Sequence, residues 1–301
     1  MHYVLKKIKR DKFIYILLLP ALLLTFVFAY LPMPGILVAF QDYNIFKGIM
    51  HSPFVGMKHI IDFFQTPKLM GSVWNTLKIS VLCLVLGFPA PIILALLFNE
   101  LKTGVFKRTI QTMSYLPYFL SWISVIGMVA AIYAVYGPLN DLRVMLFGPN
   151  TERMLFLGEQ SLFIPNVLIL TLWKETGYGS VIYLAAISSI DSQQYEAAEI
   201  DGASRFRQAI HVTLPGIMPT AIILLIMRLG GLFGSNFELI YGLQNPFINF
   251  EVISTIVYKY GIQNGDYSLA AAVGFVQGLI AFLLMAASNY FSKKVTEVGI
   301  W

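Results

Sequence analysis

The chain has 301 residues, of which 57% are hydrophobic, 14% aromatic and only 12% charged, and its mean hydropathy is +0.71. A charged fraction of about half the soluble average cannot cover a water-exposed surface, so the composition predicts an integral membrane protein and excludes a disordered or nucleic-acid-binding chain. The net charge of +5 is spread over the loops, and the single cysteine, Cys83, excludes an intrachain disulfide framework or a cysteine metal cluster.

Six apolar stretches are long enough to cross a bilayer, which takes about 20 residues of helix. We therefore predict an all-α polytopic fold in one domain, residues 1–301. The first stretch follows a basic segment, as in a signal peptide, but it is too long for one and no cleavage site follows. We expect a retained helix, with a cleaved signal as the alternative. The predicted spans are residues 13–40, 73–98, 111–135, 162–188, 217–243 and 267–291.

The loops indicate the orientation of these spans. Those on the N-terminal side hold about twice as many Lys and Arg residues as the opposite loops, and this excess is typical of the cytoplasmic side. Both termini are therefore predicted in the cytoplasm. The outer segments 41–72, 136–161 and 244–266 are rich in Gly, Pro, Asn and aromatic residues, which favours packed turns and short interfacial helices. Within the second span, Pro89 and Pro91 predict a kink.

The cytoplasmic loop at 189–216 carries the most informative pattern. Residues 195–201 favour a short helix, and Gly202 is suited to the left-handed conformation that ends one. Ser204 can cap a second short helix through His211, which we expect to end at Leu214-Pro215. Small residues and carboxylates on the first helix suit insertion into a groove of another protein. A solvated amphipathic loop is the alternative.

This loop resembles the EAA motif of the permeases of binding-protein-dependent ABC importers. Glu196-Ala197-Ala198 is followed by Gly202 and then by Val212-x-Leu214-Pro215, with Val212 where the family often has Ile. The resemblance implies a type I ABC importer permease fold, in which this loop is a coupling helix that docks on an ATP-hydrolysing subunit. The residues implied in that contact are Glu196, Ala197, Ala198, Glu199, Asp201, Gly202 and Arg205.

The similarity extends over nearly the whole chain to carbohydrate-importer permeases of the LplB/YteP type. It rests on phrases such as Ala39-Phe40-Gln41-Asp42-Tyr43 and Trp173-Lys174-Glu175. It implies import of oligosaccharides, some derived from polysaccharides, across a bacterial cell membrane. The implied partners are a second permease, two nucleotide-binding ATPase subunits and an extracytoplasmic binding protein, usually a lipoprotein. No cofactor is expected on this chain, because ATP and Mg would be used by the ATPase subunits.

Polar groups in the fourth and fifth spans are candidates for a substrate pathway, since such groups are costly inside a membrane. Trp and Tyr offer flat faces to a sugar ring, and the stretch from Trp173 aligns with sugar-lining positions of maltose-type permeases. Two glycines beside Tyr178 are expected to loosen that helix and admit another chain. The alternatives are an internal Lys–Glu arrangement, hydrogen bonds between subunits, and pairing or snorkelling for Arg228. The candidates are Trp173, Lys174, Glu175, Tyr178, Ser235, Asn236, Glu238 and Tyr241.

The sequence offers no pattern for an enzyme. It lacks the G-x-x-x-x-G-K-[ST] phosphate loop, and its four histidines are scattered without metal-ligand spacing. A membrane-embedded lipid-processing enzyme would need a catalytic cluster at one interface, and none assembles. The runner-up is a six-span half of a secondary carrier, which predicts inverted repeats and no docking loop.

Overall fold

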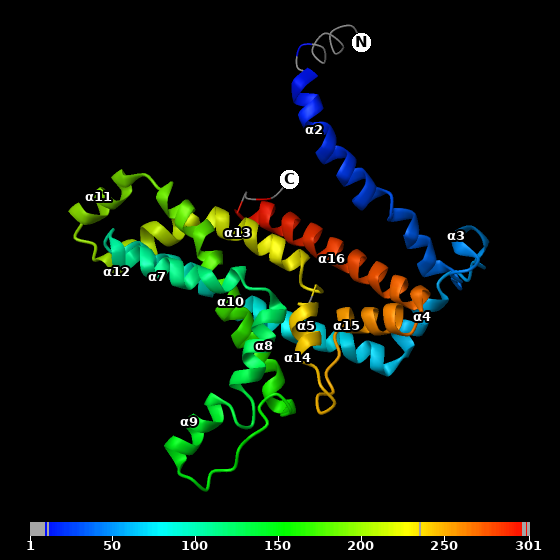
Figure 1. Ribbon diagram of the computed structural model, residues 1–301. Helices are drawn as coiled ribbons and strands as arrows, with labels where there is room; N and C mark the ends of the chain where they lie inside the picture. Colours follow the sequence, from blue (N-terminus) through cyan, green and yellow to red (C-terminus); the bar gives the residue numbers. More distant parts are fainter. Residues whose placement is uncertain (1–9, 11, 235, 297–298, 300–301) are drawn as a thin grey trace. The chain divides into compact units, whose positions relative to one another are not determined.

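The computed structural model describes residues 10, 12–234, 236–296 and 299. As predicted, its regular structure is helical (Figure 1), and an isolated bridge joins Gln41 to Phe54. The chain divides into two compact units, residues 1–66 with 257–276 and residues 67–256 with 277–301. Each unit is described by itself.

The first unit begins with a long apolar helical run from the N-terminal part of the chain. α2 (Lys12–Thr25) continues through a π-helical turn (Phe26–Tyr30) and a 3-10 segment (Met33–Phe40). None of the side chains of α2 is buried, which suits a helix surrounded by lipid. The unit also contains α3 (Gly48–His51), α4 (Lys58–Gln65), a π turn (Tyr258–Gln263) and the start of α16 (Tyr267–Thr296).

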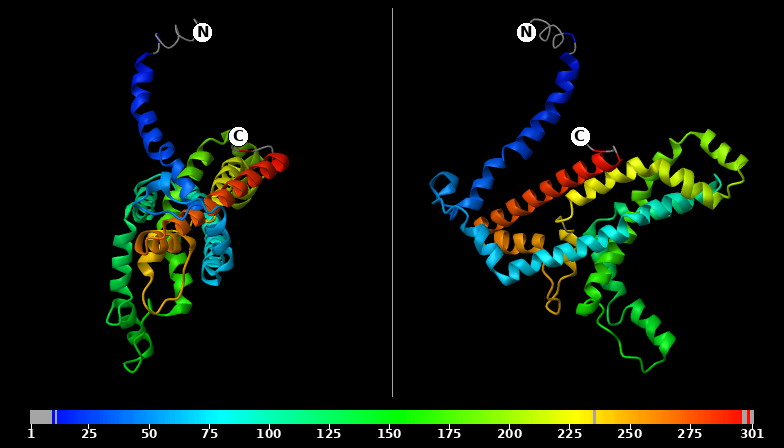
Figure 2. Two further views of the ribbon diagram at one scale, coloured as in Figure 1. Left: turned by 90° about the vertical axis from the view of Figure 1, so that its right-hand side faces the viewer. Right: turned by 180° about the vertical axis from the view of Figure 1, so that it is seen from behind.

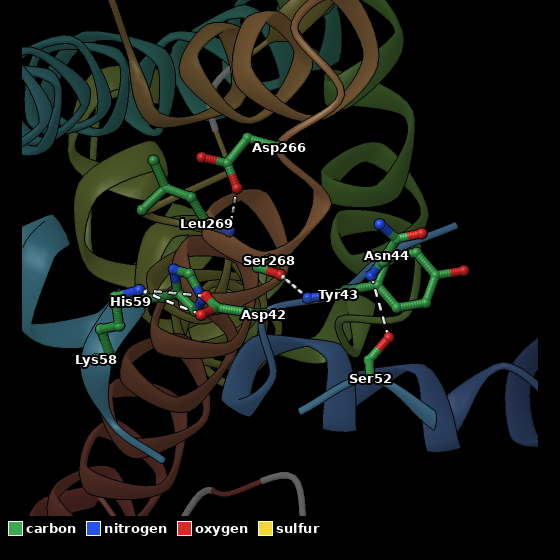
Figure 3. Close-up of polar contacts among 9 residues, drawn as sticks. All are labelled: Asp42, Tyr43, Asn44, Ser52, Lys58, His59, Asp266, Ser268 and Leu269. Carbon is green, nitrogen blue, oxygen red and sulfur yellow. Dashed lines mark hydrogen bonds and ion pairs between the residues drawn. The ribbon is translucent and has the colours of Figure 1, made fainter. Parts of the chain in front are cut away.

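A network of polar contacts holds the segment after Phe40 against the start of α16 (Figure 3). Asp42 lies 3.3 Å from the Lys58 Nζ and 3.0 Å from the His59 Nε2. The Tyr43 amide donates a hydrogen bond to the Ser268 Oγ at 2.9 Å. An apolar cluster in the same unit includes Ala39, Ile60 and Ala272. Residues far apart in the sequence are thereby joined within this unit.

The second unit is built around α10 (Phe163–Ser188), which packs against most of its other long helices. The bounds of α10 agree with the predicted fourth span. The helices around it are α5 (Pro67–Gly87), α6 (Pro89–Glu100), α7 (Val105–Tyr115), α8 (Trp122–Ile132), α9 (Pro138–Phe147), α11 (Ser192–Ile200), α12 (Arg205–Gln208), α13 (Leu214–Gly230), α14 (Phe237–Leu243) and α15 (Ile253–Val257). α9 projects at one end of this unit, and α11 with α12 project at another (Figures 1 and 2).

The third and the fifth predicted spans are interrupted in the structure. The third is bent by 101° between α7, with its 3-10 extension Leu116–Phe119, and α8. Pro117 cannot donate an amide hydrogen bond, and Ser121 starts the new helix by accepting the Ser124 amide. The fifth ends at Gly230 and resumes at Phe237, where Asn236 caps α14. The kink predicted at Pro89 and Pro91 stays a prediction, because α5 and α6 are separated only at Phe88 and together form one apolar run, Pro67–Glu100.

Four helical runs within the described residues are long and apolar enough to cross a membrane. A fifth candidate is the bent pair α7 and α8, whereas α10 is not among them. The count of six spans and the cytoplasmic termini therefore stay predictions. The four runs are Lys12–Phe40, Pro67–Glu100, Arg205–Gly230 and Tyr267–Lys294.

Candidate functional site

A cavity of about 290 Å³ lies inside the second unit. Its walls are α5, α10, the end of α13, the following segment and α14. Apolar side chains form much of the wall, and Ser80, Thr171 and Thr176 add hydroxyl groups. Cavities that mix an apolar lining with a few convergent polar groups are the usual form of ligand sites.

Two opposite charges from different helices meet in this cavity. Glu175 of α10 and Arg228 of α13 both line it and act on each other electrostatically. Among the described residues, however, they form no direct ion pair within 4.0 Å. The guanidinium packs beside Gly87, where a Cβ would lie 3.4 Å from the Arg228 Nη1. The sequence left pairing or snorkelling open for Arg228. In the structure, Arg228 and the Glu175 carboxylate line the same cavity.

The predicted pathway residues divide into two groups. Glu175 and Asn236 line the cavity, and the Asn236 Oδ1 also accepts the Leu239 amide at 3.2 Å to cap α14. Ser235 lies outside the described residues. The candidates that do not line this cavity are Trp173, Lys174, Tyr178, Glu238 and Tyr241.

Lys174 is buried and held by the bend that follows α7. Its Nζ donates a hydrogen bond to the Tyr118 carbonyl oxygen at 2.8 Å. The same ammonium lies 5.3 Å from the centre of the Tyr118 ring and 5.0 Å from that of Trp122. Tyr178 stacks on Tyr118 with 4.1 Å between ring centres. The geometry therefore fits the internal arrangement that the sequence left open, although Lys174 binds a carbonyl and two rings rather than Glu175.

The glycines beside Tyr178 serve close packing inside the chain. α10 runs through them without a break, contrary to the expected loosening. A Cβ at Gly177 would overlap the Ser114 carbonyl oxygen of α7, and one at Gly179 would lie 3.1 Å from the Pro91 Cγ. The approaching backbone is thus that of α7 in the same chain.

The loop at 189–216 folds as a helix, a tight turn and a second helix. Asp191 caps α11 by accepting the Gln193 amide, so the helix begins at Ser192 rather than at Tyr195. Its end is a Schellman motif, in which Gly202 has φ +73° and its amide donates to the Glu199 carbonyl. The Ala203 amide donates to the Ala198 carbonyl at 2.9 Å. The predicted turn at Gly202 is confirmed.

The second short helix continues into the membrane run instead of ending at Leu214-Pro215. Ser204 caps α12 as predicted. A π-helical turn (Ala209–Thr213) then joins α12 to α13, with the Leu214 amide donating to the Ala209 carbonyl. Proline lacks an amide proton and clashes with the carbonyl four residues earlier. The wider π turn directly before Pro215 gives the ring room, so the helix passes the proline.

Almost all the residues implied in the coupling contact are exposed, the exception being the half-buried Ala198. Arg205 also lies 3.5 Å from Glu100 at the end of α6. Sequence reasoning missed two apolar side chains beside the turn, Ile200 (87% exposed) and Phe206 (74% exposed). The sequence feature that could have identified them is the presence of two apolar residues in an otherwise polar segment. The exposed residues are Glu196, Ala197, Glu199, Asp201, Gly202 and Arg205.

The protein family of this chain follows from a match over most of its length. Residues 87–297, which contain the cavity walls from Gly87 onward and the whole loop, match the family described as binding-protein-dependent transport system inner membrane component. The chain belongs to that family. It is a multi-pass membrane component of an ABC transport system, and this is a transport family rather than a catalytic one. The family assignment does not favour the secondary-carrier reading.

The permease family contains curated relatives of nearly the same length. The chain is 41% identical over 297 residues to the protein LplB of Bacillus subtilis, covering 98% of this chain and 92% of that protein. It is 38% identical, with the same coverage, to the polygalacturonan/rhamnogalacturonan transport system permease YteP of the same organism. The sn-glycerol-3-phosphate permease UgpA of Yersinia pestis is 30% identical and is covered to 93%.

A solved permease structure has the same fold. It is a chain of a bacterial ABC transporter involved in import of the acidic polysaccharide alginate, with a TM-score of 0.88 and 35% identity. The match covers 98% of this chain and 99% of that one. A second structure of the alginate transporter contains an alginate pentasaccharide-bound periplasmic protein and matches equally well. The predicted ABC importer permease fold is confirmed.

Among the described residues, no group of three His, Cys, Asp or Glu side chains is placed to hold a metal ion.

Proposed function

We propose that this chain is a permease subunit of an ATP-driven importer for oligosaccharides. The observation that carries the proposal is the combination, in one permease of this family, of an exposed EAA loop with a cavity that contains hydroxyl groups and two opposite charges. Relatives with 35% identity or more include permeases named for polygalacturonan, rhamnogalacturonan and alginate transport. These names favour a sugar polymer fragment over a small ion.

A second permease subunit would complete the pathway. The cavity of about 290 Å³ is just below the range of about 300–1,000 Å³ for small-molecule sites, and an oligosaccharide is larger than such ligands. Many apolar side chains of this chain are also exposed, and some would face the partner instead of lipid. An extracytoplasmic binding protein would deliver the sugar to the pair.

The coupling loop (residues 189–216) would dock on one of two ATPase subunits. Glu196 and Glu199 are exposed on α11 beside the small Ala197, so a partner groove can approach closely and offer a cation. A charge-assisted hydrogen bond there would be stronger than a neutral one. ATP and Mg would act in the partner, and closure of the ATPase subunits would move the loop and α13 between inward- and outward-open states.

Co-purification tests this assignment. The tagged chain, co-expressed with the other subunits of its importer, should retain an ATPase subunit in mild detergent. Glu196→Ala should weaken that association by about tenfold, because it removes a charge-assisted contact. Gln194→Ala is the matched control, since Gln194 is exposed on the same helix but lies outside the motif. An unchanged association in Glu196→Ala would contradict the assigned contact, and a wild type without any ATPase subunit would contradict the importer proposal.

Uptake into proteoliposomes that contain the complete complex and its binding protein tests the substrate class. Oligogalacturonides and neutral maltooligosaccharides are suitable probes. ATP-dependent uptake of either supports the sugar class. Uptake driven by an ion gradient without ATP would support a secondary carrier instead.

A further inference from the structure

Tyr195 and Thr213 join the two halves of the coupling loop. The Tyr195 hydroxyl lies 2.9 Å from the Thr213 Oγ1. Tyr195 is in the first half of α11, and Thr213 is the last residue of the π turn that leads into α13. Tyr195 and Ala198 are the two residues of α11 that are not fully exposed. α11 therefore contacts the rest of its own chain through few residues, and the hydrogen bond from Tyr195 is one of these contacts.

Thr213 has a second contact within the loop. Its hydroxyl lies 3.4 Å from the Gln208 carbonyl oxygen, which can accept its proton. Either hydroxyl can be the donor in the hydrogen bond between Tyr195 and Thr213. The Gln208 side chain in turn donates to the Ala203 carbonyl at 3.3 Å, directly after the Gly202 turn. The chain of hydrogen bonds thus connects α11, the π turn, α12 and the turn between the helices.

Burial makes the Thr213 end of this chain sensitive to change. Thr213 is 2% exposed, so its hydroxyl has no access to bulk water as a substitute partner. The π turn around it is also the point where the helix accommodates Pro215. A hydrogen bond from α11 to this point fixes the orientation of α11 relative to the axis of α13.

We infer that Tyr195 and Thr213 are positioning residues for energy coupling, because their hydrogen bond makes α11 and the start of α13 move together when an ATPase subunit pulls on the loop. This rests on the proposed function. Without the hydrogen bond, α11 would still dock through its exposed face, but the Gly202 turn could flex and absorb the movement. The loss would then appear in transmission to the membrane helices and not in docking.

Cys83 supplies a readout of transmission that needs no sugar. It is the single cysteine of the chain, and it lines the same cavity as Arg228 of α13. The purified complex is treated with MgATP and vanadate to trap nucleotide, and the rate of alkylation of the permease by N-ethylmaleimide is measured by mass. A movement that reaches the end of α13 should change this rate. The ATPase rate and the amount of bound ATPase subunit are measured on the same samples.

The wild type should show a nucleotide-dependent change in the alkylation rate of Cys83. In Tyr195→Phe, that change should shrink roughly three- to tenfold, as expected for loss of one hydrogen bond, while the ATPase subunit stays bound. Thr213→Val should reduce it at least as much, because it also removes the contact with the Gln208 carbonyl, and the double variant should be no worse than Thr213→Val. Thr213→Ser, which keeps the hydroxyl, should behave as wild type. Tyr15→Phe is a second control, in an exposed tyrosine of α2.

A full nucleotide-dependent change in Tyr195→Phe would overturn the inference. A wild type with the same alkylation rate in both states would also overturn it, because no movement would then reach the cavity. These outcomes differ from failure of the proposed function, which would appear as a wild type without any bound ATPase subunit.

Discussion

The Lys174 ammonium donates a hydrogen bond to the Tyr118 carbonyl oxygen at 2.8 Å and so joins α10 to the bend between α7 and α8. The bend leaves backbone groups without helical partners, and the lysine satisfies one of them. The Lys174 Nζ also lies 5.3 Å from the centre of the Tyr118 ring and 5.0 Å from that of the Trp122 ring. Aromatic faces are favourable neighbours for a desolvated cation. A lysine in the middle of an apolar helix therefore stabilises a local irregularity in this permease.

Replacing this lysine tests its structural role. Lys174→Met should destabilise the protein by about 1–3 kcal/mol, because the Tyr118 carbonyl loses its donor in a buried place. Thermal unfolding in detergent measures the effect. Lys78→Met is the control, since Lys78 is exposed on α5 and should change the midpoint little. Loss of transport with an unchanged midpoint would favour a direct role in the pathway instead.

Glu175 and Arg228 should be energetically coupled across the cavity. Glu175→Gln and Arg228→Gln each leave one charge without its counterpart in a medium of low dielectric constant. The double variant should be more stable than the sum of the single effects predicts, by about 0.5–3 kcal/mol. A double-mutant cycle on unfolding free energies measures this term. Additive effects would show that the two charges act independently.

Gly177 tests the contact between α7 and α10. Gly177→Ala should reduce the yield of folded protein sharply, because the new methyl group overlaps the Ser114 carbonyl oxygen and both groups are parts of packed helices. Gly278→Ala is the matched control in α16, where nothing lies within 4 Å of the added Cβ. There alanine should stabilise the helix by about 0.5–1 kcal/mol. Size-exclusion profiles and unfolding midpoints compare the two.

A specific effect of substituting Gly202 can be distinguished from general backbone strain, because Gly265 has nearly the same conformation and can receive the same substitution. Gly202 has φ +73° and Gly265 has φ +74°, and neither has neighbours around an added Cβ. Alanine at either position should cost about 1–2 kcal/mol for the left-handed conformation. Gly202→Ala alone should lower uptake per ATP hydrolysed, since it lies in the coupling loop. Equal effects of both variants on uptake would contradict a specific role of the turn.

Local signals in the sequence explain which elements could be predicted. The bounds of α10 and the start of α16 follow from long stretches rich in apolar residues, whereas α16 continues to Thr296, beyond the predicted end at 291. Gly202 marks its turn because few other residues accept a positive φ. The start of α11 differs from the predicted start at Tyr195 because the helix is capped by Asp191, which lies before the motif. The 101° bend near Pro117 was missed because the hydropathy of the stretch stays high on both sides of it.

The site depended more on tertiary contacts. The EAA residues are a contiguous motif, so their shared position in one loop could be predicted. The cavity could not, because Cys83, Glu175 and Arg228 come from three helices whose facing sides are set by packing. Nothing in the sequence distinguishes Lys174, which points to the α7–α8 bend, from its neighbour Glu175, which points to the cavity.

The unbroken helical run from Arg205 to Gly230 has a mechanical consequence. Its 26 residues span about 39 Å at 1.5 Å per residue, with the coupling loop at one end and Arg228 near the other. A tilt of about 5° in a rod of this length displaces one tip by about 3 Å relative to the other. That distance is enough to close or open a contact such as the gap between Arg228 and Glu175. In the proposed importer, the run would work as a lever that turns a small rotation at a docked ATPase subunit into the making or breaking of a charge contact in the cavity.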